Sequence, residues 1–391
     1  MPEASLRVLA WPACRNRPYN PYNWLLSTHL TACDPRVVVG EFTPGALMFQ
    51  LWDIWHMHWP EKFLRITRRA EMLAKVGALA ALIRWAKLRG IRLVWTIHNL
   101  MSHERLYPAV EAWLRHWVVD QIDGAIALSE SSAAAARRRF ARLGHLPLAV
   151  IPHGHYIDAY PNTLDGAAAR AALGLDPHHR VLLFIGQVRR YKNVTRLIDC
   201  VGALPDPDLR LVVAGLPNDP ALAAEVRCAA QRDPRVQTHL ALIPDARLQV
   251  FLNAADLVVL PYEEILNSGS ALLALSFRRP VLVPGRGSMG ELRQRFGERW
   301  VMTYDQGLTP ATLRRALETL DRLPADGDDL ERRLRREVGW DRIAAETVSF
   351  YRSVLGRDPV AAPGARDAVP AAPAGATVSR PAPSGGRASL R

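Results

Sequence analysis

Ten short apolar runs, most of them separated by longer amphipathic stretches, constrain the fold of this 391-residue chain more than any other feature. Each run is unbroken rather than alternating, as in strands that are covered on both faces of a parallel sheet. The alternation of predicted strands and helices predicts repeated βαβ units and an α/β fold. The predicted strands are Leu6–Ala10, Val37–Gly40, Ile54–His58, Arg92–His98, Gly124–Leu128, Val181–Ile185, Leu209–Ala214, Val236–Leu240, Leu257–Leu260 and Val281–Val283.

The series of strands is broken at Ile151–Tyr156, where the sequence IPHGHY is rich in Pro, Gly and His. We therefore expect two Rossmann-like domains, residues 1–155 and 156–357, joined by a hinge. A ligand cleft should lie between the carboxyl ends of the two sheets. Residues 358–391 are rich in Ala, Pro, Gly and Ser, which predicts a disordered tail without chemistry.

The formal net charge of +12 requires an anionic partner, which could be phosphate, nucleic acid or lipid head groups. The basic runs Arg137–Arg139 and Arg332–Arg336 lack the interleaved aromatic side chains that stack on bases. We interpret them as solvated helix faces, which leaves a nucleic-acid-binding protein as the weaker alternative. Four scattered cysteines, no signal-peptide pattern and no apolar run long enough to span a bilayer predict a cytoplasmic location.

The segment Lys62–Arg89 has a helical pattern that allows two interpretations. Its apolar arc consists of Met72, Leu73, Val76, Leu79, Ala80 and Ile83. Basic residues extend this arc at both ends. The favoured interpretation is a helix packed on the sheet, and the alternative is a surface helix that rests among anionic lipid head groups.

Two segments of the second domain are suited to hold an anion. The turn GQVRRYKN follows a predicted strand and precedes a helix, and it carries Arg189 and Lys192, which we expect to be exposed. The segment Asn267–Ser270 has the residues that cap a helix, so free amides should face the same cleft. Together they predict a nucleoside diphosphate site. Asp206-Pro207-Asp208 precedes a strand and is interpreted as a solvent turn rather than a metal motif.

The sequence DIWHMHWPE at Asp53–Glu61 first suggests a metal, because His56 and His58 would share one face of a strand. No other metal-like cluster accompanies them. The alternative is that the segment ends a strand at the cleft, with His56, His58 and Glu61 facing the ligand.

Six motifs carry a resemblance to a known family: NPY (Asn20–Tyr22), HMHWPE, HNLMSHE, HGHY, RRYKN and NSGSALLALSFRRPVL. Together they resemble GT-B glycosyltransferases. More closely, they are similar to glycosyltransferase family 94, the GumI-type β-1,4-mannosyltransferases of xanthan-like exopolysaccharide assembly. The resemblance covers residues 5–355. It implies transfer of mannose from GDP-mannose to a polyprenyl-diphosphate-linked oligosaccharide, with inversion, by a peripheral protein on the cytoplasmic face of the inner membrane.

The resemblance also implies roles for particular residues. The first domain would bind the acceptor and the second the nucleotide sugar, without a metal or cofactor. The expected donor-binding residues are Arg189, Lys192, Tyr262, Asn267, Ser268, Gly269, Ser270, His98, His153 and His155. The expected catalytic base is Glu61, with Glu104 and His58 as alternatives. Glu residues of retaining GT-B enzymes are replaced here by Ile265 and Leu273, although a retaining or UDP-sugar-dependent enzyme stays an alternative.

Overall fold

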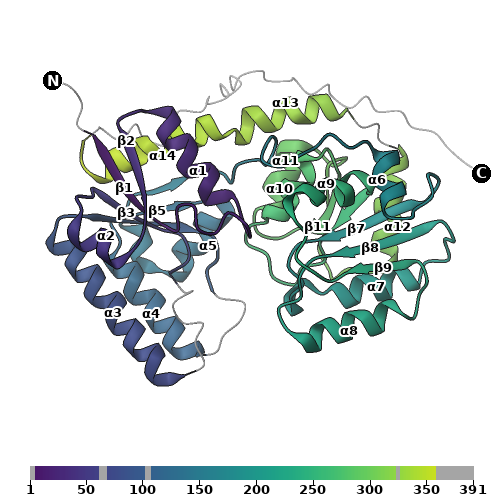
Figure 1. Ribbon diagram of the computed structural model, residues 1–391, viewed down its shortest axis with the longest axis horizontal. Helices are drawn as coiled ribbons and strands as arrows, with labels where there is room; N and C mark the ends of the chain where they lie inside the picture. Colours follow the sequence, from purple (N-terminus) through teal and green to yellow (C-terminus); the bar gives the residue numbers. More distant parts are fainter. Residues whose placement is uncertain (1–4, 61–67, 102–106, 323–325, 358–391) are drawn as a thin grey trace, which may run out of the picture. The chain divides into compact units, whose positions relative to one another are not determined.

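The computed structural model describes residues 5–60, 68–101, 107–322 and 326–357. These residues form two six-stranded sheets in which every strand pair is parallel (Figure 1). The first sheet has the order β2-β1-β3-β4-β5-β6 and the second β12-β11-β10-β7-β8-β9. The strands are β1 Leu6–Trp11, β2 Val37–Glu41, β3 Ile54–Met57, β4 Arg92–Ile97, β5 Gly124–Ala127, β6 Leu148–Val150, β7 Arg180–Ile185, β8 Leu209–Ala214, β9 Val236–His239, β10 Leu257–Val259, β11 Val281–Pro284 and β12 Val301–Tyr304.

Helices connect most successive strands. They are α1 Tyr22–Cys33, α2 Pro44–Phe49, α3 Arg69–Leu88, α4 Pro108–Gln121, α5 Glu130–Arg139, α6 Gly166–Ala172, α7 Val194–Gly202, α8 Pro220–Ala230, α9 Asp245–Ala254, α10 Gly269–Ser276, α11 Met289–Phe296, α12 Pro310–Arg322, α13 Gly327–Val338 and α14 Trp340–Val354, with short 3-10 turns η2 Ala141–Gly144 and η3 Arg190–Lys192. The predicted α/β architecture of two parallel sheets is confirmed.

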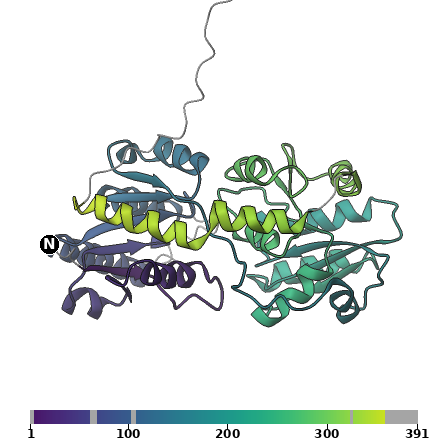
Figure 2. The ribbon, with the colours of Figure 1, turned by 90° about the horizontal axis from the view of Figure 1, so that it is seen from above.

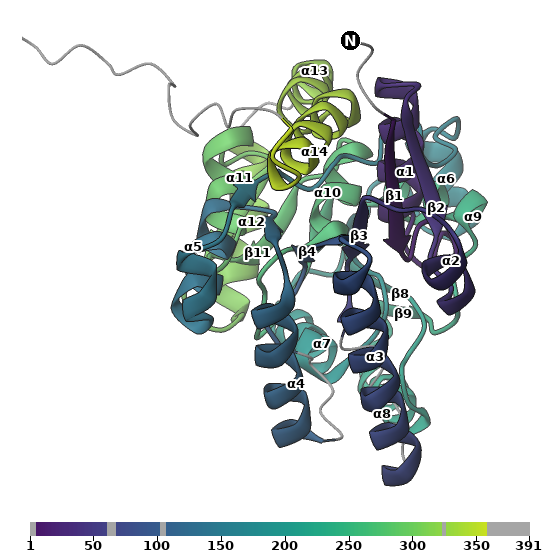
Figure 3. The ribbon, with the colours of Figure 1, turned by 90° about the vertical axis from the view of Figure 1, so that its left-hand side faces the viewer.

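Both faces of the first sheet are covered, which explains its unbroken apolar strands. Alternate side chains point to opposite faces, so Val8 and Ile54 join the core beneath α1 and α14, whereas Leu9 and Trp55 join the core beneath α3 and α4. Figure 3 shows α3 and α4 side by side, on the face opposite α14.

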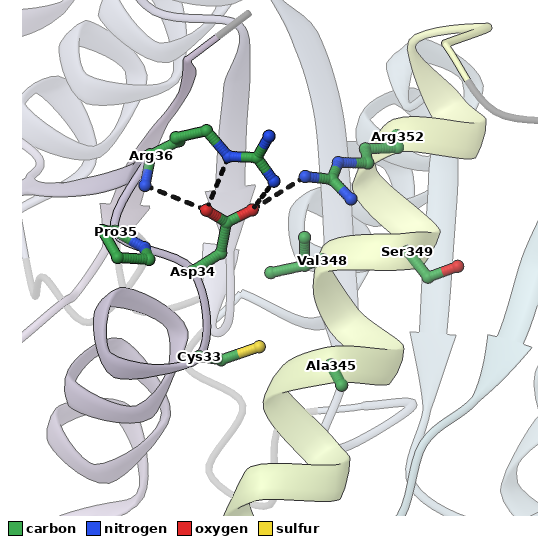
Figure 4. Close-up of a pocket in the computed structure, with 8 residues that line it drawn as sticks. All are labelled: Cys33, Asp34, Pro35, Arg36, Ala345, Val348, Ser349 and Arg352. Atoms are coloured by element: carbon green, nitrogen blue, oxygen red, sulfur yellow. Dashed lines mark hydrogen bonds and ion pairs between the residues drawn. The ribbon is translucent and has the colours of Figure 1, made fainter. Parts of the chain in front are cut away.

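Helix α14 belongs to the end of the chain but packs against the first sheet and α1 (Figure 2). The hydroxyl of Tyr351 lies 2.7 Å from His56 Nδ1 in β3. Arg352 bonds Asp34, which also accepts two bonds from the Arg36 guanidinium (Figure 4). The two guanidiniums hold the pKa of Asp34 well below its usual range, chiefly through hydrogen bonds from Arg36. A buried hydrogen bond and an ion pair therefore fasten the last helix to the first strands.

The helical arc predicted between Lys62 and Arg89 is observed as α3, which begins at Arg69 rather than at Lys62. Met72, Val76, Leu79 and Ile83 are buried in the core, which confirms the favoured interpretation for these four residues. Leu73 was assigned to the same arc, but it is 61% exposed. In the described part of the chain, we find no helix long and apolar enough to cross a membrane.

Candidate functional site

Gly186 and Gly215 directly follow β7 and β8, at the carboxyl end of the second sheet, and their backbone conformation requires glycine. Gly186 has φ +124° and Gly215 has φ +149°, in the region where a side chain is strained. A Cβ on Gly215 would overlap the carbonyl oxygen of Gly186. A Cβ on Gly186 would lie 3.1 Å from Ser270 Oγ and 3.5 Å from Lys192 Nζ. The backbones of the two glycines therefore approach each other closely, with Ser270 and Lys192 beside Gly186.

Lys192 differs from its predicted environment, because its side chain is buried and only 8% exposed. Its ammonium nitrogen lies 5.0 Å from the centroid of the Tyr262 ring and 6.0 Å from that of Phe184. Burial lowers the pKa of Lys192. No carboxylate lies within ion-pair distance of Lys192 among the residues that the structure describes. A cation in this environment is prepared for an anion from outside the chain.

Arg189 lies before Lys192 in the same turn and is partly exposed. Its guanidinium donates hydrogen bonds of 3.1 and 2.7 Å to the Gln187 side chain. The sequence prediction that both cations are exposed is therefore wrong for Lys192. The short turn η3 carries Lys192 back beneath Tyr262, which sequence spacing alone does not reveal.

Helix α10 begins as predicted, with Ser268 as its cap: Ser268 Oγ accepts a hydrogen bond from the Ala271 amide at 3.2 Å. Tyr262 is buried, and burial raises its pKa to about 12, although side-chain hydrogen bonds with Ser270 and Ser268 oppose this shift. The Lys192 ammonium, the Ser270 hydroxyl and the start of α10 thus meet at Gly186. A helix start beside a buried cation is a favourable place for a phosphate.

The hinge segment contributes one of its two histidines to this place. His153 Nε2 lies 3.5 Å and the Tyr156 hydroxyl 3.0 Å from the position that a Cβ on Gly269 would take. Burial lowers the pKa of His153 to about 4, so this imidazole is neutral at pH 7. His155 lies elsewhere, with its backbone bonded to Val338 and to the Trp340 ring nitrogen. The structure gives no contact between His155 and the start of α10.

A cluster of rings lies across from α10, at the carboxyl end of the first sheet. His58 Nδ1 lies 3.1 Å from His98 Nε2, so one ring donates and the other accepts. Trp59 stacks on His98 with ring centroids 4.3 Å apart. The Tyr22 ring contacts His58, His98 and His153, at centroid distances of 5.9, 5.0 and 4.6 Å. Tyr22 therefore joins three predicted site residues, a role that its place in the NPY motif did not reveal.

His56 does not line a cleft, contrary to the prediction. It is 1% exposed, and its two ring nitrogens lie 2.7 Å from the hydroxyl groups of Thr96 and Tyr351. Burial lowers its pKa to about 3. The next side chain along β3 on the same face, His58, reaches the ring cluster instead. His56 is therefore a structural residue of the core. Because both of its ring nitrogens already have hydrogen-bond partners, the metal interpretation is also disfavoured.

The expected catalytic bases Glu61 and Glu104 lie outside the described residues, as do Lys62 and His103. Among the described residues, one group has the composition and spacing of a metal site: Asp176, His178 and His179. It lies before the amino end of β7, whereas Gly186 follows the carboxyl end of that strand. His179 Nδ1 accepts a hydrogen bond from the Asp176 amide, so the neutral ring carries its proton on Nε2, where a metal would bind. Asp206 and Asp208 form the predicted turn, since Asp208 donates its amide to Asp206.

The loop after β1 is held by one carboxylate. Glu41 Oε2 accepts hydrogen bonds from the successive amides of Ala13, Cys14 and Arg15, at 3.2, 2.7 and 3.0 Å. The Arg15 side chain is exposed, and the Arg17 guanidinium stacks 4.0 Å above the Trp24 ring. This loop leads directly into Tyr22 of the ring cluster.

Two cavities lie in different parts of the chain. A cavity of about 270 Å³ lies at the carboxyl end of β9 and is lined by residues that include Arg227, His239 and Arg247. His239 Nε2 is buried without a hydrogen-bond partner among the described residues. A cavity of about 630 Å³ lies between Cys33–Arg36 and α14, where Asp34 bridges two arginines (Figure 4). It is remote from α10, and we assign it to the packing of α14.

Contacts also join the two sheets directly. Asn267 Oδ1 accepts a hydrogen bond from Ser132 Oγ at 3.0 Å, and Asn267 Nδ2 donates to the His98 carbonyl at 3.3 Å. The structure thus brings Lys192, Tyr262, Ser268, Gly269, Ser270 and His153 together. Asn267 and His98 meet beside them. The geometry is that of an anion site in the second sheet facing a histidine cluster in the first.

Comparisons with known proteins identify relatives of the chain. Residues 179–317 match the family described as "Glycosyl transferases group 1". The chain is 32% identical over 347 residues to the GDP-mannose:glycolipid 4-beta-D-mannosyltransferase of Xanthomonas campestris, covering 87% of this chain and 90% of the relative. It is 27% identical to the alpha-maltose-1-phosphate synthase of Mycolicibacterium smegmatis, over 71% of this chain and 76% of that one.

Solved structures share the fold. Sucrose-phosphate synthase from Thermosynechococcus elongatus superposes with a TM-score of 0.67 at 16% identity, over 90% of this chain and all of that one. HepE from Anabaena, solved in complex with UDP and glucose, gives a TM-score of 0.66 at 15% identity, over 89% of this chain and all of that one. With two parallel Rossmann-like sheets and a relative of this identity and coverage, the chain is a hexosyltransferase of the GT-B fold and belongs to the glycosyltransferase family that contains the GDP-mannose:glycolipid 4-beta-D-mannosyltransferase of Xanthomonas campestris.

Proposed function

We propose that the protein transfers mannose from GDP-mannose to a polyprenyl-diphosphate-linked oligosaccharide, with inversion at the anomeric carbon, in exopolysaccharide synthesis. The printed activity of the Xanthomonas relative supports the donor and a glycolipid acceptor. The observation that carries the proposal is the buried Lys192 ammonium, which faces Ser270 and the start of α10 without a carboxylate partner among the described residues. A diphosphate supplies the missing negative charge.

The nucleotide fits the second sheet by distance. Strand β9 is two strands from β7, which corresponds to about 10 Å. The base would enter the cavity at β9, which Arg227, His239 and Arg247 line, while the phosphates reach Lys192 and the Ser268–Ser270 amides. Tyr262 and Asn267 would shape the loop next to the sugar. Arg189 would neutralise the outer phosphate oxygens.

The reaction needs a base on the acceptor side. We propose that Glu61 takes the proton from the acceptor hydroxyl as its oxygen attacks the anomeric carbon. The bond from that carbon to the phosphate oxygen breaks, and GDP leaves with the electron pair. Glu104 and His58 are the alternative bases. Lys192, Arg189 and the α10 amides stabilise the leaving diphosphate, so we propose a mechanism without a metal ion.

The acceptor side offers cations and apolar surface. Arg15 and Arg17 are exposed in the loop that leads into Tyr22, where an anionic acceptor would approach. Trp113 on α4 is 56% exposed and stacks on Trp117, and exposed Leu73 lies on the neighbouring α3 (Figure 3). Exposed aromatic and basic side chains are typical of proteins that rest on a lipid surface. We therefore propose peripheral attachment to the cytoplasmic face of the membrane.

A thermal-shift series with GDP, UDP, ADP and their sugars tests the donor. A saturating ligand at 100 times its Kd stabilises the folded state by about 2.7 kcal/mol, so the preferred nucleotide stands out clearly. We expect GDP and GDP-mannose to raise the melting temperature most. A larger shift with UDP would contradict the donor and favour the UDP-sugar alternative. Product linkage and anomeric configuration, read by NMR, distinguish inversion from retention.

Phosphatidylglycerol vesicles test the membrane proposal. Binding should fall steeply with salt, because charges are screened over about 8 Å at physiological ionic strength. Trp113→Ser should weaken it, while Tyr19→Ser, another exposed aromatic residue outside α3 and α4, is the matched control. Equal binding to neutral vesicles, or none to either kind, would contradict attachment through anionic lipid.

A further inference from the structure

Helix α5 of the first sheet begins against α11 of the second. Ser129 caps α5 in the usual way, with its hydroxyl oxygen accepting the Ser132 amide at 3.1 Å. The two amides before it, those of Glu130 and Ser131, donate to Glu291 of α11 at 3.1 and 2.8 Å. All three amides of the first turn are therefore bonded, two of them by a carboxylate about 160 residues away.

This carboxylate is connected to the loop that precedes α10. The amide of Ser288, just before α11, donates to the Leu266 carbonyl at 2.9 Å. Gly287 has φ +58°, and a Cβ there would lie 2.6 Å from the same oxygen, so this close approach requires glycine. Asn267, next to Leu266, makes the contacts with Ser132 and His98. Glu291 and Asn267 thus reach the first sheet from one connected loop.

The bonds from Glu291 are of a strong kind. A carboxylate at a helix N-terminus gains both charge-assisted hydrogen bonds and the attraction of the helix dipole. Glu291 is partly exposed, so solvent reduces the gain, but two bonds in parallel also fix its direction. When the two sheets move apart, both amides must find water and α5 loses part of its cap.

We propose that Glu291 is a positioning residue, which holds the loop before α10 in register with the histidine cluster by capping α5 across the cleft. The proposal rests on the transfer reaction proposed above for its kinetic consequence, but the contact itself does not depend on which sugar is transferred. Asn267 of this loop also contacts the His98 carbonyl, so the cap and this contact hold the loop together. Glu291 does not touch the reacting atoms.

Two pairs of variants isolate this contact. Glu291→Gln keeps the size of the side chain and removes its charge, and Glu298→Gln, which pairs with Arg293, is the control on the same side. Glu130→Pro removes one donor amide at the first helical position, where proline is tolerated and where the preceding Ser129 is already extended. Glu130→Ala is its control, because it keeps the amide.

Hydrogen exchange and kinetics provide separate measurements. Glu291→Gln leaves one uncharged acceptor oxygen for two amides, so exchange should speed roughly ten- to hundredfold at the Glu130 or Ser131 amide that loses its charged acceptor. We expect kcat to fall about tenfold in Glu291→Gln and Glu130→Pro, with the melting temperature lowered by only a few degrees and the GDP affinity close to the parent. Both controls should match the parent. Parental exchange in Glu291→Gln, or parental kcat in both test variants, would overturn the proposal, whereas a different donor specificity would overturn only the proposed function.

Discussion

Replacing Lys192 with Met should separate the stability of the protein from its affinity for a nucleoside diphosphate. Met retains most of the apolar length of the Lys stem, so the contacts with Phe184 and Tyr262 are largely kept. The variant removes a buried charge that has no carboxylate partner among the described residues, and burial of such a charge costs free energy. We expect the ligand-free variant to melt at or above the parental temperature.

The loss in affinity follows from the contact that disappears. A hydrogen bond to a charged group contributes about 1.5–3 kcal/mol, which corresponds to roughly a 10- to 150-fold change in Kd for GDP. Arg189→Met should weaken binding less, because the Arg189 guanidinium is partly exposed and bonded to Gln187. Burial lowers the pKa of Lys192 from 10.5, so GDP affinity should decline at a lower alkaline pH than for an ordinary lysine. The Met variant should lack this decline.

Isothermal titration with GDP and a thermal melt of the ligand-free protein measure the two quantities. Unchanged GDP affinity in Lys192→Met would exclude Lys192 as a phosphate ligand. A large fall in the melting temperature without ligand would show instead that the ammonium is needed by the fold. Either result would refute the inference from its burial.

Three further predictions concern stability and turnover. Tyr351→Phe should destabilise the protein by about 1–3 kcal/mol, because it leaves His56 Nδ1 buried without its partner. Urea unfolding measures this loss, with Tyr19→Phe at an exposed tyrosine as the control. Equal stability of Tyr351→Phe and the parent would contradict the role given to this bond. Acid should also destabilise the protein: His56 and His153 have folded pKa values of about 3 and 4 against 6.5 when unfolded, so the unfolded chain binds more protons below pH 6.5. Each then removes about 1.4 kcal/mol per pH unit down to its folded pKa, and stability that does not change between pH 6.5 and 4.5 would be inconsistent with their burial. Glu61→Gln should lower turnover about 10²- to 10⁴-fold while GDP still binds; parental turnover together with an inactive Glu104→Gln would transfer the role of base to Glu104.

The sequence predicted the strands that are buried on both faces of a sheet. Strands covered on both faces have unbroken apolar runs, and each of the ten predicted runs overlaps an observed strand. The two missed strands are at sheet edges: β6 is only partly buried, and β12 ends in the half-buried Thr303 and Tyr304. An edge strand buries less surface, so its apolar pattern is weaker.

The candidate site was predictable only in its local parts. The cap at Ser268 could be predicted from the residue types of Asn267–Ser270, because capping is decided within one turn. The burial of Lys192 depends on Tyr262, and the cap on α5 depends on Glu291, which is about 160 residues away. Contacts of this kind are created by tertiary packing and leave no spacing in the sequence.

The position of α14 has a consequence for how the protein is made. Tyr351 is synthesised 295 residues after its partner His56, which at 5–20 residues per second corresponds to roughly 15–60 s. During that interval the core that α14 shares with α1, including Val8 and Ile54, lacks the side chains of α14. The core of the first sheet is therefore completed only when the end of the chain is made, and a chain that ends before Trp340 would leave part of this apolar face exposed.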